Sequence, residues 1–355
     1  MNFVFYHRRF TMKLKSLMLV VFTLICAGVF AQKYTLKIAS IAPGRSQWDV
    51  DQRMLAQEIS KATNGEVAIR FYDISTLGGE KSVIQKMRAV RPGQKAALDG
   101  AIFTSLGVSE LAPKTDIVTM CIPFLFHNDD EVNYVLKSYP GMKKAIEDEG
   151  YELLGWFSVG WAKFFTKELA KTPQAMKSLR MSVGTLDSPA IGELFQVAGF
   201  NTFDVPKEKL LQSTKSSDGL QGMYSIPMYA YAAQYSKNLK YVLDVPICPI
   251  MAAFVVSKTS WDKIPANYQK KIRELTSAYE EKFVAVENQM NEEYTEKMKQ
   301  DGNVIVKLTD AELDVWKKTF AADIERAAKS KSTIINYKFY SDMQNLLTEY
   351  RAGKK

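Results

Sequence analysis

PANYQKKIRELTSAYEEKFVAVENQMNEEYTEKMKQ, residues 265–300, is the longest regularly patterned stretch of the chain. Its apolar side chains recur every three or four residues, which is the spacing of one helical face. They are Tyr268, Ile272, Leu275, Tyr279, Phe283, Val286, Met290, Tyr294 and Met298. About 35 helical residues at 1.5 Å each would span roughly 50 Å, longer than a small domain is wide. A strand-like segment at 304–307 and more helix follow, so we expect a helix that crosses two lobes rather than a coiled coil.

Upstream of this helix, strand-like and helix-like segments alternate. An apolar run at 34–39 is followed by a helical stripe that Ser46 opens and Gly65 closes, and then by a second apolar run at 67–72. Such alternation predicts an α/β fold with a mainly parallel sheet covered by helices. The same criteria predict strands at 101–104, 152–156, 180–183, 240–245 and 252–257, and helices at 81–90, 130–137, 188–198 and 226–235.

The N-terminal segment, residues 1–31, has the pattern of a secretory signal peptide. Four basic and no acidic residues precede an apolar run at 17–25, which is too short to span a bilayer. Cleavage after Ala31 fits this pattern, and Met12 is an alternative start. Lipid attachment at Cys26 is a rival that Ile25 disfavours, since a small residue is expected before a lipidated cysteine. We therefore expect export to the periplasm.

Net charge and cysteine content argue against nucleic-acid binding and favour free thiols over a disulfide. Without the four basic residues of the leader, the formal net charge falls from +8 to +4. No Lys/Arg-rich run with interleaved aromatics remains, so nucleic acid is not an expected partner. Cys121 and Cys248 are the cysteines left after cleavage, and they lie in apolar runs that favour buried free thiols over a disulfide. Their sequence positions leave their pairing open.

Catalytic constellations are missing from the sequence. After the leader, the chain has a single histidine, His127, which excludes a site with two histidine ligands. The sequence has no GxSxG, GxxxxGK[ST], GxGxxG or HExxH motif. We expect no enzyme activity, no cofactor and no metal. Export combined with two α/β lobes favours capture of a small-molecule ligand in a cleft between lobes.

Several segments resemble the DctP family, the extracytoplasmic binding subunits of tripartite ATP-independent periplasmic (TRAP) transporters. They keep the family's order over about residues 33–350. They are KATNGEVAIRFYDISTLGGEKSVIQKMRAV (61–90), CIPFLFHNDDEVNYVL (121–136), GYELLGWFSVGWAKFFT (150–166), TPQAMKSLRMSV (172–183), SSDGLQG (216–222) and VVSKTSWDKIPANYQKKI (255–272).

The resemblance implies a two-lobed periplasmic solute-binding protein with a ligand cleft between the lobes. We expect lobe I to comprise residues 33–157 and 251–285, and lobe II residues 158–250 and 286–355. Partners implied by the family are the small and large integral membrane subunits of the transporter. A subset of the family also works with a periplasmic tetratricopeptide-repeat protein.

The positions where the family holds a carboxylate are changed here. Ser182 occupies the place of the family's arginine in the LKxRV motif, and Lys163 aligns with a second arginine. Gly222 replaces an asparagine, and Ala252 replaces a polar residue at the start of a late strand. With the aromatic residues nearby, the candidate ligand-binding set is Trp48, Phe103, Thr104, Ser105, Trp161, Lys163, Ser182, Thr185, Gly222, Tyr224 and Ala252.

A cleft with few charges and aromatic walls favours a hydrophobic or uncharged ligand, because burying a carboxylate without partners costs several kcal/mol. Two alternatives stay open. One is an organic acid held by Lys163 and Arg180. The other is an exported structural or interaction protein that binds no small molecule.

Overall fold

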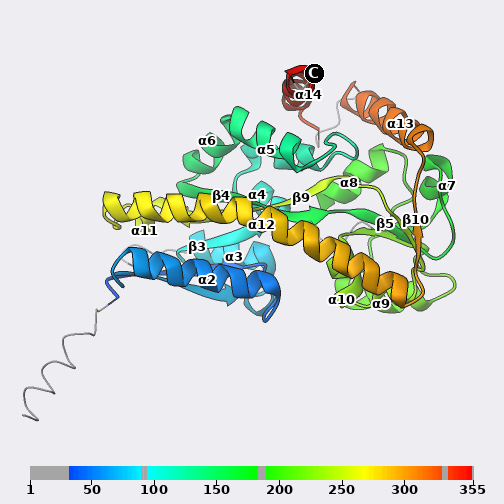
Figure 1. Ribbon diagram of the computed structural model, residues 1–355. Helices are drawn as coiled ribbons and strands as arrows, with labels where there is room; N and C mark the ends of the chain where they lie inside the picture. Colours follow the sequence, from blue (N-terminus) through cyan, green and yellow to red (C-terminus); the bar gives the residue numbers. More distant parts are fainter. Residues whose placement is uncertain (1–31, 89–90, 92–93, 183–188, 330–334, 354–355) are drawn as a thin grey trace, which may run out of the picture.

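The computed structural model describes residues 32–88, 91, 94–182, 189–329 and 335–353. The signal peptide expected at 1–31 lies outside these residues. In Figure 1 the chain forms two α/β lobes, with one long helix running along both. No helix of the described part is long and apolar enough to cross a membrane.

Lobe I is built on a five-stranded sheet with the order β2-β1-β3-β9-β4. Strands β1, β2 and β3 are parallel, while β9 is antiparallel to both of its neighbours. Its strands are β1 (Tyr34–Ser40), β2 (Val67–Asp73), β3 (Gly100–Thr104), β4 (Tyr151–Trp161) and β9 (Pro249–Ser257). Its helices are α2 (Gln47–Ala62), α3 (Gly79–Arg88), α4 (Ser105–Leu111), α5 (Asp129–Ser138), α6 (Gly141–Asp148) and α11 (Lys258–Trp261).

Lobe II contains a second five-stranded sheet, with the order β10-β8-β5-β7-β6. Central strand β5 is antiparallel to β7 and β8, and the outer pairs are parallel. Its strands are β5 (Lys163–Thr166), β6 (Met181–Ser182), β7 (Gly222–Ser225), β8 (Tyr241–Leu243) and β10 (Val304–Val306). Its helices are α7 (Pro173–Ser178), α8 (Pro189–Val197), α9 (Lys207–Lys215) and α10 (Pro227–Ala232).

The prediction of a mainly parallel sheet is confirmed in both lobes, where four of the five strands run in one direction, but each sheet also contains one antiparallel strand, β9 in lobe I and β5 in lobe II. The cause lies in the two segments that cross between the lobes, β4 to β5 and β8 to β9, which run antiparallel to each other. Where they cross, Ala162 donates its N–H to the carbonyl of Cys248 and accepts from the N–H of Ile247, both at 3.0 Å. The lobes are therefore joined by a paired two-stranded connection.

The long helix predicted at 265–300 is confirmed as α12 (Ala266–Gln300), which follows Pro265. It packs on β4 and α2 in lobe I and on α10 in lobe II. The predicted start of the first helix is also confirmed, since the Ser46 side chain accepts from the N–H of Asp49 at the N-cap of α2.

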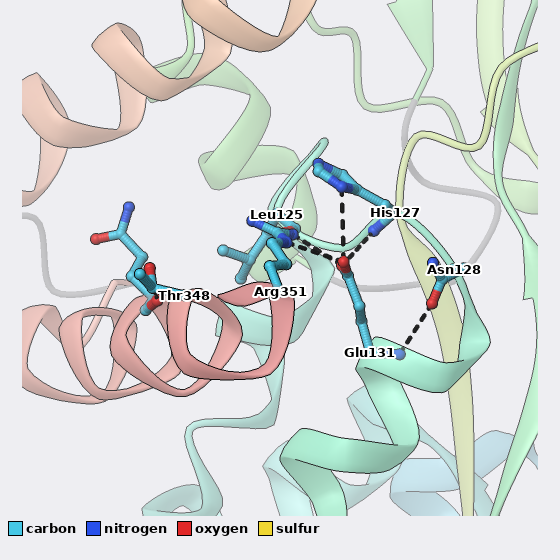
Figure 2. A network of polar contacts seen from close by, with 7 residues as sticks. Leu125, His127, Asn128, Glu131, Thr348 and Arg351 are labelled. Carbon is cyan, nitrogen blue, oxygen red and sulfur yellow. Dashed lines mark hydrogen bonds and ion pairs between the residues drawn. The ribbon is translucent and has the colours of Figure 1, made fainter. Parts of the chain in front are cut away.

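The chain ends with α13 (Asp310–Lys329), which packs on α7 and α8, and α14 (Tyr337–Gly353), which packs on α5. Our boundaries assign residues 286–355 to lobe II, but α14 lies with lobe I. The physical reason is apolar packing: Phe339, Tyr340, Met343 and Leu347 of α14 are buried in the same cluster as the apolar residues of α5. Arg351 also donates through Nε and Nη2 to Glu131 of α5 at 2.8 Å each. Figure 2 shows Glu131 between Arg351 and His127.

Candidate ligand-binding site between the lobes

A cavity of about 760 Å³ lies between the two lobes. Residues from the carboxyl ends of β1, β2 and β3 line it on the lobe I side. Residues from β7 and α10 line it on the lobe II side, and the crossing segments contribute Val159, Ala162 and Ile250. In open α/β sheets, ligands bind beyond the carboxyl ends of parallel strands, so the cavity occupies the expected place for a site.

The lobe I wall of the cavity is formed by backbone turns and carboxylates. Asp73 ends β2, and its carboxylate accepts from the N–H and hydroxyl of Ser75 at 2.7 Å. Gly78 and Gly79 follow with φ of 91° and 85°, values that side-chain-bearing residues rarely adopt. They turn the chain into α3, whose second residue is Glu80.

Glu80 fixes the end of β3. Its carboxylate accepts from the N–H of Thr104 at 2.6 Å and from the Thr104 hydroxyl at 2.8 Å. A Cβ at Gly107 would lie only 2.6 Å from this carboxylate, so glycine is what allows α4 to approach it. This arrangement places polar backbone groups and the Glu80 carboxylate in the lobe I wall.

The lobe II wall is apolar and aromatic. It is made by Tyr224 and Ser225 at the end of β7 and by Ile226, Met228 and Tyr229 where α10 begins. Tyr224 is fully buried and its hydroxyl is hydrogen-bonded to the thiol of Cys248. Burial raises the pKa of Tyr224 well above its ordinary value, so this side chain stays neutral.

The charges that line the cavity are mainly negative. Asp73, Glu80 and Glu110 are carboxylates, Lys81 is the basic residue, and no arginine belongs to the lining in the described part of the chain. A cleft with this balance repels an anionic ligand and lacks the guanidinium fork that holds a carboxylate bidentately.

Three of the residues predicted from the sequence line this cavity, namely Trp48, Thr104 and Tyr224. Ala252 lines a separate, smaller cavity in lobe I. Thr185 lies outside the described residues. The other six, which are Phe103, Ser105, Trp161, Lys163, Ser182 and Gly222, do not belong to the lining of the cavity.

Each of these six residues is either buried away from the cavity or bonded to another part of the chain. Phe103 and Ser182 are fully buried, and the Ser105 hydroxyl donates to the carbonyl of Met251. The Trp161 indole donates to Asp129 at 3.0 Å, and Lys163 forms an ion pair with Asp244. A Cβ at Gly222 would collide with the sulfur of Met181, so no side chain can project from this position.

Arg180 also has partners away from the cavity. Its Nε donates to the carbonyl of Gly219 at 2.9 Å and its Nη2 to that of Ser217 at 3.3 Å. The pair proposed to hold an organic acid, Lys163 and Arg180, is thus engaged elsewhere in this structure.

Sequence reasoning missed most of the lobe I wall. Asp73, Glu80 and Glu110 did not enter the predicted set, although Asp73 directly follows a predicted strand and Glu80 follows the Gly-Gly pair. Both positions are signals for a strand-end site. On the lobe II side, Met228 and Ile226 were missed because apolar residues at a helix start resemble core residues.

The two cysteines of the described part are buried free thiols that lie side by side at the crossing connection. Burial raises the pKa of the Cys248 thiol, whereas the hydrogen bond with Cys248 lowers the pKa of Cys121. The expectation of free thiols agrees with this arrangement.

The single histidine of the described part serves the fold. The N–H of His127 donates to Glu131 at 2.8 Å, and the Asn128 side chain accepts from the N–H of Glu131 at 3.0 Å, which caps α5 (Figure 2). Burial and the nearby Arg351 lower the pKa of His127. In the described part of the chain, no group of three metal-ligating side chains comes together.

Two α/β lobes, a paired two-stranded connection and a cavity between the lobes define a bilobal solute-binding protein. Residues 38–331 match the model of the DctP family, described as bacterial extracellular solute-binding protein, family 7. The chain belongs to this family, and it is a solute receptor rather than an enzyme.

Two relatives match the chain at low sequence identity. An uncharacterized protein of Haemophilus influenzae is 26% identical over 204 residues, which cover 57% of this chain and 59% of that protein. The match thus extends over less than two thirds of that relative. A solute-binding protein of Roseobacter denitrificans is 20% identical over 281 residues, covering 77% of this chain and 82% of the other.

Solved structures share the fold. A TRAP periplasmic solute-binding protein from Ochrobactrum anthropi, with its C-terminus bound in the ligand-binding pocket, superposes with a TM-score of 0.78 at 16% identity, covering 91% of this chain and 97% of the other. One from Ralstonia eutropha, with bound (S)-2-acetolactate, has a TM-score of 0.72 at 18% identity and coverages of 89% and 99%.

Proposed function

We propose that this chain is the periplasmic binding subunit of a TRAP transporter and captures a small hydrophobic or uncharged solute in the interlobe cavity. The observation that carries the proposal is the lining of the cavity: aromatic and alkyl side chains form the lobe II wall, and the lobe I wall combines apolar residues with three carboxylates and Lys81 but no arginine in the described part of the chain. A carboxylate ligand would lose its hydration there, and in the described part of the lining it would meet three carboxylates and a single basic residue, Lys81.

Delivery to the small and large integral membrane subunits of the transporter follows from family membership. Export by residues 1–31 would place the chain where such a subunit works. A periplasmic tetratricopeptide-repeat protein is a further proposed partner, by resemblance to the subset of the family that uses one.

The Ralstonia eutropha relative binds an organic acid, and so an acid held by Lys163 and Arg180 is the second candidate. The structure argues against it, because Lys163 is paired with Asp244 and Arg180 binds the carbonyls of Gly219 and Ser217.

Thermal unfolding with millimolar C4-dicarboxylates tests the proposal. We expect no change in the Tm of the wild type, since a ligand that binds the native state raises Tm and a non-ligand does not. A rise in Tm that Lys163→Ala and Arg180→Ala abolish together would contradict the proposal and establish the organic acid.

Mass spectrometry of the denatured protein provides the complementary experiment. Tight binders often keep their ligand through purification, so we expect an uncharged small molecule to be released. A structural protein without a ligand would release none, and a retained dicarboxylate would refute the proposal.

A further inference from the structure

A second cavity, of about 50 Å³, lies in lobe I, between one face of the sheet and helices α2 and α12. We call it the side pocket. Phenylalanine rings dominate its lining: Phe71 and Phe254 are 6.4 Å apart, and Phe157 meets Phe283 edge to face at 5.6 Å. Leu55 of α2 and Ala252 of β9 complete the apolar surface used below.

The side pocket adjoins the interlobe cavity, because Ile41, Trp48 and Val159 line both. Trp48 is fixed at this boundary. Its indole Nε1 donates to the buried carboxyl of Glu287 on α12, and its ring lies 6.2 Å from that of Phe283. The two spaces therefore share part of their lining, and Trp48 is held in that shared part by its contacts with α12.

Polar groups of the lining are turned away from the space. The Ser40 hydroxyl donates to Gln52 at 2.6 Å, and the Gln52 amide donates to Asp49 at 2.9 Å. Asp51 and Tyr279 also belong to the lining, but Asp51 Oδ2 and the Tyr279 hydroxyl oxygen are buried and have no hydrogen-bond partner in the described part of the chain. What faces the side pocket is carbon, and a cavity of that kind excludes water and accepts apolar atoms.

The volume limits the occupant. An engineered apolar cavity of about 150 Å³ binds benzene, which has six carbons. By that proportion, 50 Å³ holds roughly two carbons, such as an ethyl group or the two methyl groups of an isopropyl group.

We propose that the side pocket receives the alkyl end of the ligand that the interlobe cavity holds. The ligand class is an uncharged small molecule with a short, compact alkyl group, whose polar part stays in the interlobe cavity between Thr104 and Tyr229. This inference rests on the proposed function and deepens it, since it names the part of the ligand that lobe I recognises.

Xenon is the probe that tests the side pocket independently of any ligand, because it fills apolar cavities. We expect xenon-pressurised crystals of the wild type to show xenon against Leu55 and Phe254. Ala252→Leu should remove it, since Ala252 lines the side pocket and not the interlobe cavity. The matched control is Ala145→Leu, a similarly buried alanine of α6 that lines neither space, and it should keep the xenon. Absence of xenon from the wild type would overturn the proposal.

Two uncharged amides test the orientation of the ligand. Isobutyramide carries an isopropyl group, where acetamide carries a methyl group. We expect the wild type to bind isobutyramide at least about tenfold more tightly, the effect of burying two more carbons. Ala252→Leu should reduce this ratio to near one, and Ala145→Leu should preserve it. An equal affinity of the wild type for both amides, or a ratio unchanged in Ala252→Leu, would overturn the proposal.

A second variant covers the case in which Ala252→Leu fails to fold. Leu55→Ala enlarges the side pocket without adding bulk, and it should shift the preference from isobutyramide to the longer 3-methylbutanamide. An unchanged preference would contradict the proposal. The proposed function fails by different results, namely a Tm that rises with dicarboxylates or a retained dicarboxylate, and xenon binding is independent of both.

Discussion

The two walls of the interlobe cavity are built from different chemistry. The lobe I wall consists of strand ends, glycine turns and the carboxylates Asp73, Glu80 and Glu110, whereas the lobe II wall consists of Tyr224, Ile226, Met228 and Tyr229. All the charged residues of the described lining therefore belong to lobe I, where they stand beside apolar residues such as Ile41, Trp48 and Leu106, while the lobe II wall carries no charge. The difference teaches that charge enters the cavity from one lobe only, so variants in the two walls should affect binding differently.

The aromatic cluster that packs behind the lobe II wall is where we expect a substitution to have the largest effect on stability. Phe164 is fully buried and lies 5.6–6.2 Å, between ring centroids, from Phe195, Phe200, Tyr224 and Trp316. We expect Phe164→Ala to lower the free energy of unfolding by about 3–5 kcal/mol, the usual cost of removing a core phenylalanine. Urea denaturation followed by circular dichroism measures it.

The control for this variant is Phe203→Ala. Phe203 is 43% exposed, and we expect a change within about 0.5 kcal/mol. A loss below about 1 kcal/mol in Phe164→Ala would show that the cluster does not support the wall.

Behind the lobe I wall, a buried carboxyl makes stability depend on pH. Burial, with Asp51 and Asp129 nearby, raises the pKa of Glu287 from 4.5 to about 8. The native state thus holds a proton that the unfolded state has released between these values, so its contribution to stability falls as the pH rises through this window. We expect Glu287→Gln to raise Tm by about a few degrees at pH 8.5 and to have little effect near pH 4.5.

Differential scanning calorimetry across pH 4.5–8.5 checks this prediction. Glutamine keeps an oxygen that can accept from the Trp48 indole, so the variant removes the ionisation and preserves the contact. Glu292→Gln, on the exposed face of the same helix, is the matched control and should follow the wild type. A Tm gain that is the same at both ends of the range would contradict the assignment.

The contributions of the two walls to binding can be compared by the change in ligand affinity that one substitution in each wall causes. We expect Tyr229→Ala to weaken binding of isobutyramide about tenfold, because a large half-buried ring leaves the lobe II wall. Glu110→Gln should change it less than about threefold, since Glu110 is exposed at the rim of the lobe I wall. Isothermal titration calorimetry measures both. The opposite ranking would mean that lobe I charge dominates recognition.

The elements that sequence reasoning found are those with local signals. Apolar spacing located α12, and the capping pattern at Ser46 located the start of α2. Strand β7 was missed because its four residues, Gly222–Ser225, carry no alternation. The antiparallel strand of lobe I could not be predicted, since the position of β9 between β3 and β4 depends on pairing between residues 88 to 156 apart in the sequence.

The same limit applies to the site. Trp48 and Thr104 were found because they lie at a helix start and a strand end, which local pattern marks, and Tyr224 was found because it lies beside a position that the resemblance marks. Ser182 and Lys163 came from resemblance alone, which places a residue in the sequence but does not say what covers it. In the folded chain Ser182 is fully buried and Lys163 meets Asp244, a partner 81 residues away.

The placement of β9 also dictates the order in which the protein can be assembled during synthesis and export. Strands β1 to β4 leave the ribosome or the translocation channel first, but β3 and β4 are not neighbours and have no pairing with each other. The strand that joins them, Pro249–Ser257, emerges only after nearly all of the lobe II sheet. The lobe I sheet therefore cannot be completed until this late segment has been synthesised. Until then the edges of β3 and β4 are unpaired, and unpaired strand edges are the surfaces on which a folding intermediate aggregates.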